Sequence, residues 1–450
     1  MTAIAPAPPL PADLLAHFLL LLVVLLALAR VLGGLAMRIG LPAIVGELLT
    51  GVLLGPSLLG WLAPGVATWL VPSEPSALHL VDAVGQIGLL LLVALTGTHL
   101  DMRAVRRQSR AAITVSLCGL VIPLAAGIGL GIALAGVLAA GGPAASPAAG
   151  AVFPLFLGVA MCVTAIPVIA KTLTDMGLLH RNIGQLTLSA GMVDDAVGWL
   201  LLSIVSAAAT TGIVTGQIAV SVAAMLGFLL VAAVLGRPAV RWLMARTADR
   251  DSPGPAVAAA VVVIAGSGLI THVLHLEAIF GAFVAGVLIS TAGAPAQRAL
   301  APLRTVTLAV LAPIFLATAG LRMDLTALAD PTVLLAALAV LAVAIAGKFI
   351  GAYLGARLSR LSRWEGLALG AGMNARGVVE VIVALTGLRL GVLDSTGYTV
   401  IVLVALVTSL MAPPLLRLAM NRIEQSAEED LRAADHAEWM SAPAPPHRST

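Results

Sequence analysis

Long apolar runs recur along almost the whole length of this 450-residue chain. A helix needs about 20 mostly apolar residues to cross the hydrocarbon core of a membrane. Hydrophobic residues make up 60% of the chain and charged residues only 10%, whereas roughly a quarter of an ordinary soluble domain is charged. A soluble globular protein is therefore excluded. The runs predict an all-α membrane protein with about thirteen transmembrane helices, at residues 14–36, 40–62, 80–100, 112–139, 151–173, 184–208, 214–236, 255–274, 277–293, 303–321, 331–357, 365–388 and 396–420.

The arginines between these runs alternate between the two sides of the membrane. Short cytoplasmic loops are enriched in Lys and Arg, and one side has only Arg322 and Arg389. The other side carries Arg38, Arg103, Arg106, Arg107, Arg110, Arg181, Arg237, Arg241, Arg246, Arg250, Arg298, Arg304, Arg357, Arg360, Arg363 and the arginines of the tail. An odd number of spans then predicts an outside N-terminus and a cytoplasmic C-terminus. Because the basic residues are dispersed among short loops, no nucleic-acid partner is expected.

Two of the predicted spans contain a polar, helix-breaking tetrad. If residues 214–236 form a linker, the six spans before it and the six after it make two inverted repeats. The fifth span of one repeat contains Thr164-Ala165-Ile166-Pro167, and the fifth span of the other contains Asn374-Ala375-Arg376-Gly377. Discontinuous helices at corresponding positions of two repeats indicate a binding site in transporters. Pro and Gly are also common in ordinary membrane helices, which is the alternative interpretation.

Few ionisable residues lie at membrane depth, and each is a functional hypothesis. A charge at the bilayer centre costs at least about 2.5 to 3.5 kcal/mol, so each needs a partner or a role. The set consists of Glu47, Lys171, Asp194, Asp195, Lys348, Arg376 and Glu380.

Asp194 and Asp195 are adjacent in an otherwise apolar helix. Adjacent helical positions point about 100° apart, so one carboxylate can face a cavity while the other faces a neighbouring helix. Two carboxylates this close cannot both ionise freely unless a cation is near. A group that holds either a proton or a metal cation is what coupled exchange requires. A purely structural acidic pair is the alternative.

The remaining intramembrane charges suggest partners for one another. Lys348, one of two lysines in the chain, needs a carboxylate, and Asp194 is the natural candidate, unless Lys348 extends to the membrane interface instead. Arg376 and Glu380 are spaced i, i+4 and can pair on one helical turn, which favours a structural or gating role over ion binding.

Neutral oxygens are also expected at the first broken helix. Pro167 lacks an N–H and clashes with the carbonyl of Val163, which is thereby freed from the helix ladder. This carbonyl and the Thr164 hydroxyl are suitable ligands for a hard monovalent cation. Glu47 lies in a Gly-rich span and is either a packing or a gating group.

At these residues the sequence resembles the monovalent cation:proton antiporters, in the branch of the bacterial potassium efflux antiporters and the plant cation/proton exchangers. The resemblance covers nearly the whole chain and is most specific at residues 46–56, 164–173, 189–195 and 373–380. It implies that Asp195 carries either cation or proton. It also implies that Asp194 is a variable neighbour and that Lys348 pairs with it, as in electrogenic members.

The resemblance implies a homodimer whose core domain moves like an elevator against a dimerisation domain. Residues 1–420 would form the transmembrane antiporter domain, with the dimerisation part at about 14–110 and 255–321 and the core part at about 112–208 and 331–420. Residues 421–450 are too few and too polar for a domain and are predicted to be a short disordered cytoplasmic tail.

The predicted function is secondary antiport of Na+ or K+ against H+, in the cell inner membrane and in the service of pH homeostasis. No enzymatic activity and no cofactor are expected. The expected partners are the cation, the proton, the lipid bilayer and a second copy of the chain. Two other functions stay open: sodium-coupled symport of an organic solute, and a membrane sensor of the same fold without net transport.

Overall fold

The computed structural model describes residues 10–71, 75–98, 110–141, 149–178, 181–211, 215–247, 252–425 and 429. Within these ranges the chain is helical, with a single isolated bridge between Ala139 and Leu393. The helices of its first half are α1 (Ala12–Arg38), α2 (Ala43–Leu54), α3 (Leu59–Leu62), α4 (Pro64–Leu70), α5 (Pro75–Thr98), α7 (Arg110–Leu138), α8 (Ala149–Cys162), α9 (Ile166–Asp175), α10 (Asn182–Thr211) and α11 (Thr215–Val231).

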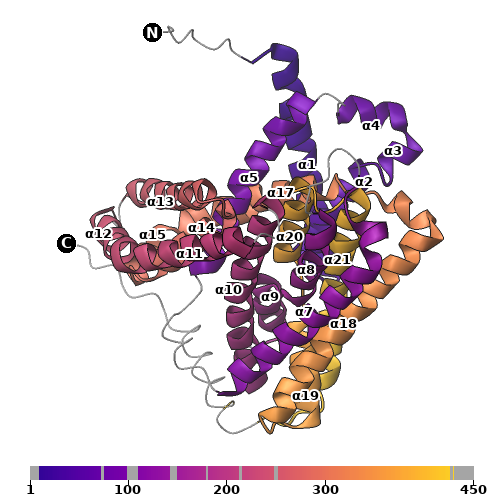
Figure 1. Cartoon of the computed structure of the whole chain (residues 1–450). Helices are drawn as coiled ribbons and strands as arrows, with labels where there is room; N and C mark the ends of the chain where they lie inside the picture. Colours follow the sequence, from indigo (N-terminus) through magenta and orange to yellow (C-terminus); the bar gives the residue numbers. More distant parts are fainter. Residues whose placement is uncertain are drawn as a thin grey trace.

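The second half of the chain continues as helices to the end of the described region (Figure 1). They are η1 (Ala232–Gly236), α12 (Arg237–Thr247), α13 (Gly254–Val273), α14 (Ala278–Ser290), α15 (Ala294–Ala299), α16 (Ala301–Val306), η2 (Thr307–Leu311), α17 (Ala312–Gly320), η3 (Leu325–Ala329), α18 (Pro331–Leu358), α19 (Arg363–Met373), α20 (Val378–Arg389) and α21 (Ser395–Met420).

Ten helical segments in the described ranges are long and apolar enough to cross a membrane. An eleventh is formed if α19 and α20, which are bent by 47° at their break, count as one span. The other two predicted ranges, 151–173 and 277–293, contain the shorter apolar helices α8 and α14, because a break ends α8 at Cys162 and a turn ends α14 at Ser290. The all-α membrane class is confirmed. The number of thirteen crossings and the two inverted repeats stay predictions.

The long helices pack in two groups. In the first group, α7 packs against α8, α10 and α18, while α21 packs against α19 and α20. In the second group, α5 packs against α14 and α17, α1 packs against α2 and α17, and α13 packs against α14. Figure 1 shows α11 to α15 on one side of the molecule and α18 and α19 on the other.

Several residues that the sequence singled out lie beyond the described part. The side chains of Pro167 and Lys171 are among them, as are the loop arginines of 101–109 and most of the predicted tail 421–450. Within that tail, Glu429 accepts a hydrogen bond from Arg181 Nε at 3.2 Å. Residue 429 is therefore attached to the helical body.

Glycines set the close approach of α18 to α7. A Cβ atom on Gly351 would lie 2.5 Å from the carbonyl oxygen of Cys118, and one on Gly355 would lie 2.6 Å from Val115 Cα. Gly347 lies over Pro123 on the same face, at i−4 from Gly351. This small-residue stripe lets the two backbones touch, as in other membrane helix pairs. It holds Lys348 beside α7.

Replacing Gly351 by Leu is expected to separate α18 from α7 and lower the stability of the protein by about 1 to 3 kcal/mol, the usual range for overpacking. The measurement is the thermal unfolding midpoint in detergent. Ala342→Leu is the matched control, because Ala342 is exposed on the same helix. Equal midpoints for the two variants would contradict the close packing of these helices.

Candidate functional site

The two broken helices meet at their breaks. The first break, at residues 163–165, separates α8 from α9, and the second, at residues 374–377, separates α19 from α20. The N–H of Ala165 donates to the carbonyl oxygen of Ala375 at 3.2 Å. A Cβ atom on Gly377 would lie 2.6 Å from Val168 Cγ2, so the glycine lets the two breaks approach without a shift of that side chain. The crossing of the discontinuous helices is therefore present in the structure.

The first break lies slightly earlier in the chain than the predicted tetrad 164–167. Ile166 and Pro167 belong to the first turn of α9 rather than to the break. Proline is tolerated there because the first N–H groups of a helix have no intrahelical acceptor. In the described part of the chain no hydrogen bond reaches the carbonyl oxygen of Val163. The predicted release of that oxygen is therefore compatible with the structure.

Asp194 on α10 is fully buried and surrounded by donors. Its Oδ1 accepts a hydrogen bond from Ser116 Oγ at 2.6 Å. Its Oδ2 accepts from Thr164 Oγ1 at 2.8 Å and from Lys348 Nζ at 2.6 Å. Lys348 Nζ also donates to the carbonyl oxygen of Gly119 at 2.9 Å, and both side chains of the ion pair have 0% exposure. The predicted pairing of Asp194 with Lys348 is thus present.

Asp195 has the opposite environment. Its side chain is also buried, yet among the described residues neither carboxylate oxygen has a hydrogen-bond partner. The backbone N–H of Ile166, at the start of α9, faces this carboxyl group. The start of a helix carries a partial positive charge, which favours an anion. Of the two adjacent carboxyl groups, Asp195 is therefore the one without a hydrogen-bond partner among the described residues.

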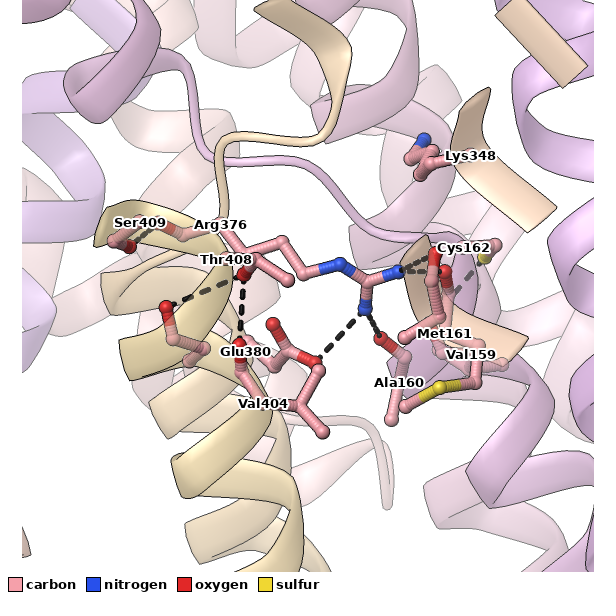
Figure 2. A network of polar contacts seen from close by, with 12 residues as sticks. Val159, Ala160, Met161, Cys162, Lys348, Arg376, Glu380, Val404, Thr408 and Ser409 are labelled. Atoms are coloured by element: carbon pink, nitrogen blue, oxygen red, sulfur yellow. Dashed lines mark hydrogen bonds and ion pairs between the residues drawn. The ribbon is translucent and has the colours of Figure 1, made fainter. Parts of the chain in front are cut away.

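The side chain of Arg376 caps the C-terminal end of α8, the first half of the first broken helix (Figure 2). Its Nη1 donates to the carbonyl oxygen of Ala160 at 2.9 Å and to Glu380 Oε1 at 2.9 Å. Its Nη2 donates to the carbonyl oxygens of Met161 at 2.6 Å and Ala344 at 3.2 Å. The last carbonyls of a helix lack intrahelical donors and carry partial negative charge. The guanidinium group satisfies two of these carbonyls at the end of α8, and the predicted pairing with Glu380 is present.

Two other predicted site residues, Asn374 and Glu47, make no described hydrogen bond or ion pair with the acidic pair. Asn374 is buried at the second break, and in the described region neither atom of its amide group has a partner. Thr164 Oγ1 donates to Asp194, so among the described hydrogen bonds it is a partner of Asp194 and not of Asp195. Glu47 is buried on α2, which packs against α1 and α17, and no ion pair of its carboxylate is found in the described ranges. Glu47 thus lies apart from the acidic pair.

Three contacts of the site were missed from the sequence. Ser116 donates to Asp194, Gly119 accepts from Lys348, and Ser409 Oγ donates to the carbonyl oxygen of Arg376. Ser116 could have been singled out from the sequence, because it is a polar hydroxyl residue in the apolar span 112–139. Backbone carbonyl acceptors such as that of Gly119 have no signal in residue type.

The chain is similar to known proteins along most of its length. The family model described as "Sodium/hydrogen exchanger, transmembrane" matches residues 20–422. "Na(+)/H(+) antiporter NhaS4" of Synechocystis sp. is 30% identical over 88% of this chain and 95% of its own length. "Cation/H(+) antiporter 20" of Arabidopsis thaliana is 31% identical over 87% of this chain, which spans 47% of that protein. The chain thus spans about half the length of its plant relatives. The named relatives are transporters and not enzymes.

A solved structure shares the fold. The sodium proton antiporter MjNhaP1 from Methanocaldococcus jannaschii superposes with a TM-score of 0.64, at 17% identity, over 90% of this chain and 99% of that one. The apolar helices and the match of the family model across 20–422 lead to one conclusion. The chain is a multi-pass integral membrane protein that belongs to the sodium/hydrogen exchanger family.

Proposed function

We propose that this protein exchanges a monovalent cation, Na+ or K+, for H+ across the membrane, and that Asp195 carries each in turn. One observation supports this proposal most strongly. Of two adjacent buried carboxyl groups at the crossing of the broken helices, Asp194 is saturated by three donors and Asp195 has no hydrogen-bond partner in the described part.

The chemistry follows from the burial of Asp195. An ionised carboxylate without a partner in a low-dielectric interior is strongly unfavourable, so the group binds a proton or a cation. The two ligands compete for the same oxygens and cannot both be held well. We assign the carbonyl oxygen of Val163 and the hydroxyl oxygen of Thr164 as further cation ligands, because both lie at the break next to α10. With a proton or a cation bound, the negative charge of Asp195 is neutralised and the site can move from one side of the membrane to the other. The unoccupied, ionised carboxylate cannot make this movement.

Asp194 and Lys348 are proposed to set the number of charges moved per cycle. Their ion pair is 2.6 Å long and inaccessible to water in the described structure. A cation at Asp195 also attracts the adjacent carboxylate of Asp194 and competes with the ammonium group of Lys348. A lysine that loses its counter-ion in a buried site is driven to give up its proton. Exchange would then release more than one proton for each cation and be electrogenic.

The division of the helices suggests how the site reaches both sides. We propose that residues 112–208 and 331–420 move as a core, like an elevator, against a dimerisation part at 14–110 and 255–321. The separate packing of α7, α8, α10, α18, α19 and α21 supports this division. In this proposal two copies associate in the cell inner membrane, with the N-terminus outside, the C-terminus in the cytoplasm and residues 421–450 as a short tail.

Asp195→Asn is expected to abolish exchange, because an amide neither binds a proton at working pH nor neutralises a cation. The measurement is cation-dependent dequenching of a pH-sensitive dye in everted vesicles, with Na+ and K+ tested singly. Activity should fall to the level of vesicles without the protein. Asp13→Asn, an exposed carboxyl at the start of α1, is the control and should leave the rate unchanged. Full activity of Asp195→Asn would contradict the proposal.

Membrane potential is expected to change the rate of exchange by the wild-type protein in proteoliposomes. Lys348→Gln should remove that dependence, since an amide has no proton to release when the cation binds. The measurement is the initial cation flux at a series of clamped potentials. A wild-type flux that is indifferent to the potential would argue against a role of the Asp194 and Lys348 pair in charge movement.

A further inference from the structure

The face of α10 that carries Asp195 continues as a polar stripe toward the end of the helix. At about 100° per residue, positions 195, 199, 203, 206 and 210 fall within a sector of about 80°. They are occupied by Asp195, Trp199, Ser203, Ser206 and Thr210. The adjacent residue Asp194 lies outside this stripe, because its carboxylate points to α7 and α18.

The middle of this stripe consists of buried polar atoms without partners. Trp199, Ser203 and Ser206 have exposures of 1%, 0% and 3%. Trp199 Nε1 and Ser203 Oγ form no hydrogen bond to any described residue, and Ser206 Oγ, also without one, faces the carboxyl group of Glu277. Helical hydroxyl groups usually bond to the carbonyl one turn earlier, as Thr210 and Thr187 do on this same helix. A buried donor left without a partner is unfavourable, and such donors in proteins are commonly satisfied by enclosed water.

A large cavity begins where this stripe ends. Its volume is about 900 Å³, and Ser206 and Thr210 of α10 form part of its wall. The opposite wall comes from α5 and from the turn between α13 and α14, with the acidic residues Asp82 and Glu277. The cavity therefore lies between the two groups of helices. Arg389 also lines it, which places it on the side that the arginine pattern assigns to the exterior.

Along α10, Trp199 lies between Asp195 and the residues that line the cavity, and it belongs to an aromatic pair. Trp199 is one helical turn from Asp195, whereas Ser206 is about three turns, or roughly 16 Å, away. The ring of Trp199 packs against that of Phe283 on α14, with centroids 6.1 Å apart and planes inclined by 41°. Phe283 belongs to the second group of helices, so this contact joins the two groups at the level where the stripe would otherwise reach the carboxyl group.

We propose that the polar stripe of α10 is the outer access route by which water, protons and hydrated cations pass between the cavity and Asp195, and that Trp199 and Phe283 form its constriction. This assignment rests on the proposed antiport. The hydroxyl groups of Ser203 and Ser206 and the N–H of Trp199 hold the water of the route. Movement of the core shifts Trp199 past Phe283 and opens the constriction.

Thiol accessibility tests the route without measuring transport. In a protein whose Cys118 and Cys162 are replaced by Ala, the single variants Ser206→Cys and Ser203→Cys are purified in detergent. Their reaction with a small cationic methanethiosulfonate is followed by mass spectrometry. Ala208→Cys is the matched control, because Ala208 is 3% exposed on the same helix but about 140° away from Ser203. Ser206→Cys should react fast, Ser203→Cys more slowly, and Ala208→Cys not at all.

Truncating either aromatic side chain of the constriction should raise the thiol reactivity of the stripe positions only. Trp199→Ala, and separately Phe283→Ala in case the first variant does not fold, should raise the reaction rate of Ser203→Cys at least tenfold and leave Ala208→Cys unreactive. If Ser203→Cys reacts no faster than Ala208→Cys in every background, or if both rise together, the route is wrong. A reactive Ser203→Cys in a protein without cation or proton flux would overturn the proposed antiport and leave the route intact.

Discussion

The buried ion pair between Asp194 and Lys348 is the interaction on which the rest of the site depends. It holds Asp194 in a fixed position, where Ser116 and Thr164 also donate to its carboxylate, and the carbonyl oxygen of Gly119 accepts a second bond from Lys348. The glycine stripe of α18 brings Lys348 close enough to α7 for these bonds to form. Because Asp194 is occupied, Asp195 is left as the only partnerless carboxylate of the adjacent pair within the described structure.

A second compensated charge stabilises the crossing itself. Interrupting a membrane helix exposes backbone carbonyls to an interior without water, which is tolerated only where other groups satisfy them. The guanidinium group of Arg376 satisfies those of Ala160 and Met161, while Glu380 balances its charge. Two cations therefore have different tasks. Arg376 satisfies carbonyl oxygens at the end of α8, and Lys348 is the ion-pair partner of Asp194.

The sequence predicted these ion pairs because few charges lie in the membrane and each must find a partner. It also located both breaks within a residue or two, since Pro and Gly mark them. It could not show that Thr164 donates to Asp194 or that Glu47 lies apart, because both depend on how helices distant in sequence pack. The acceptors Gly119, Ala160 and Met161 act through backbone oxygens, which any residue possesses.

The central claim is that one carboxyl group holds either a proton or a cation. Proton release on cation binding tests it most directly, with purified protein in a weakly buffered detergent solution. We expect that adding Na+ or K+ acidifies the solution in proportion to the cation bound, and that the acidification disappears in the Asp195→Asn variant. Cation binding that releases no proton from the wild-type protein would contradict it.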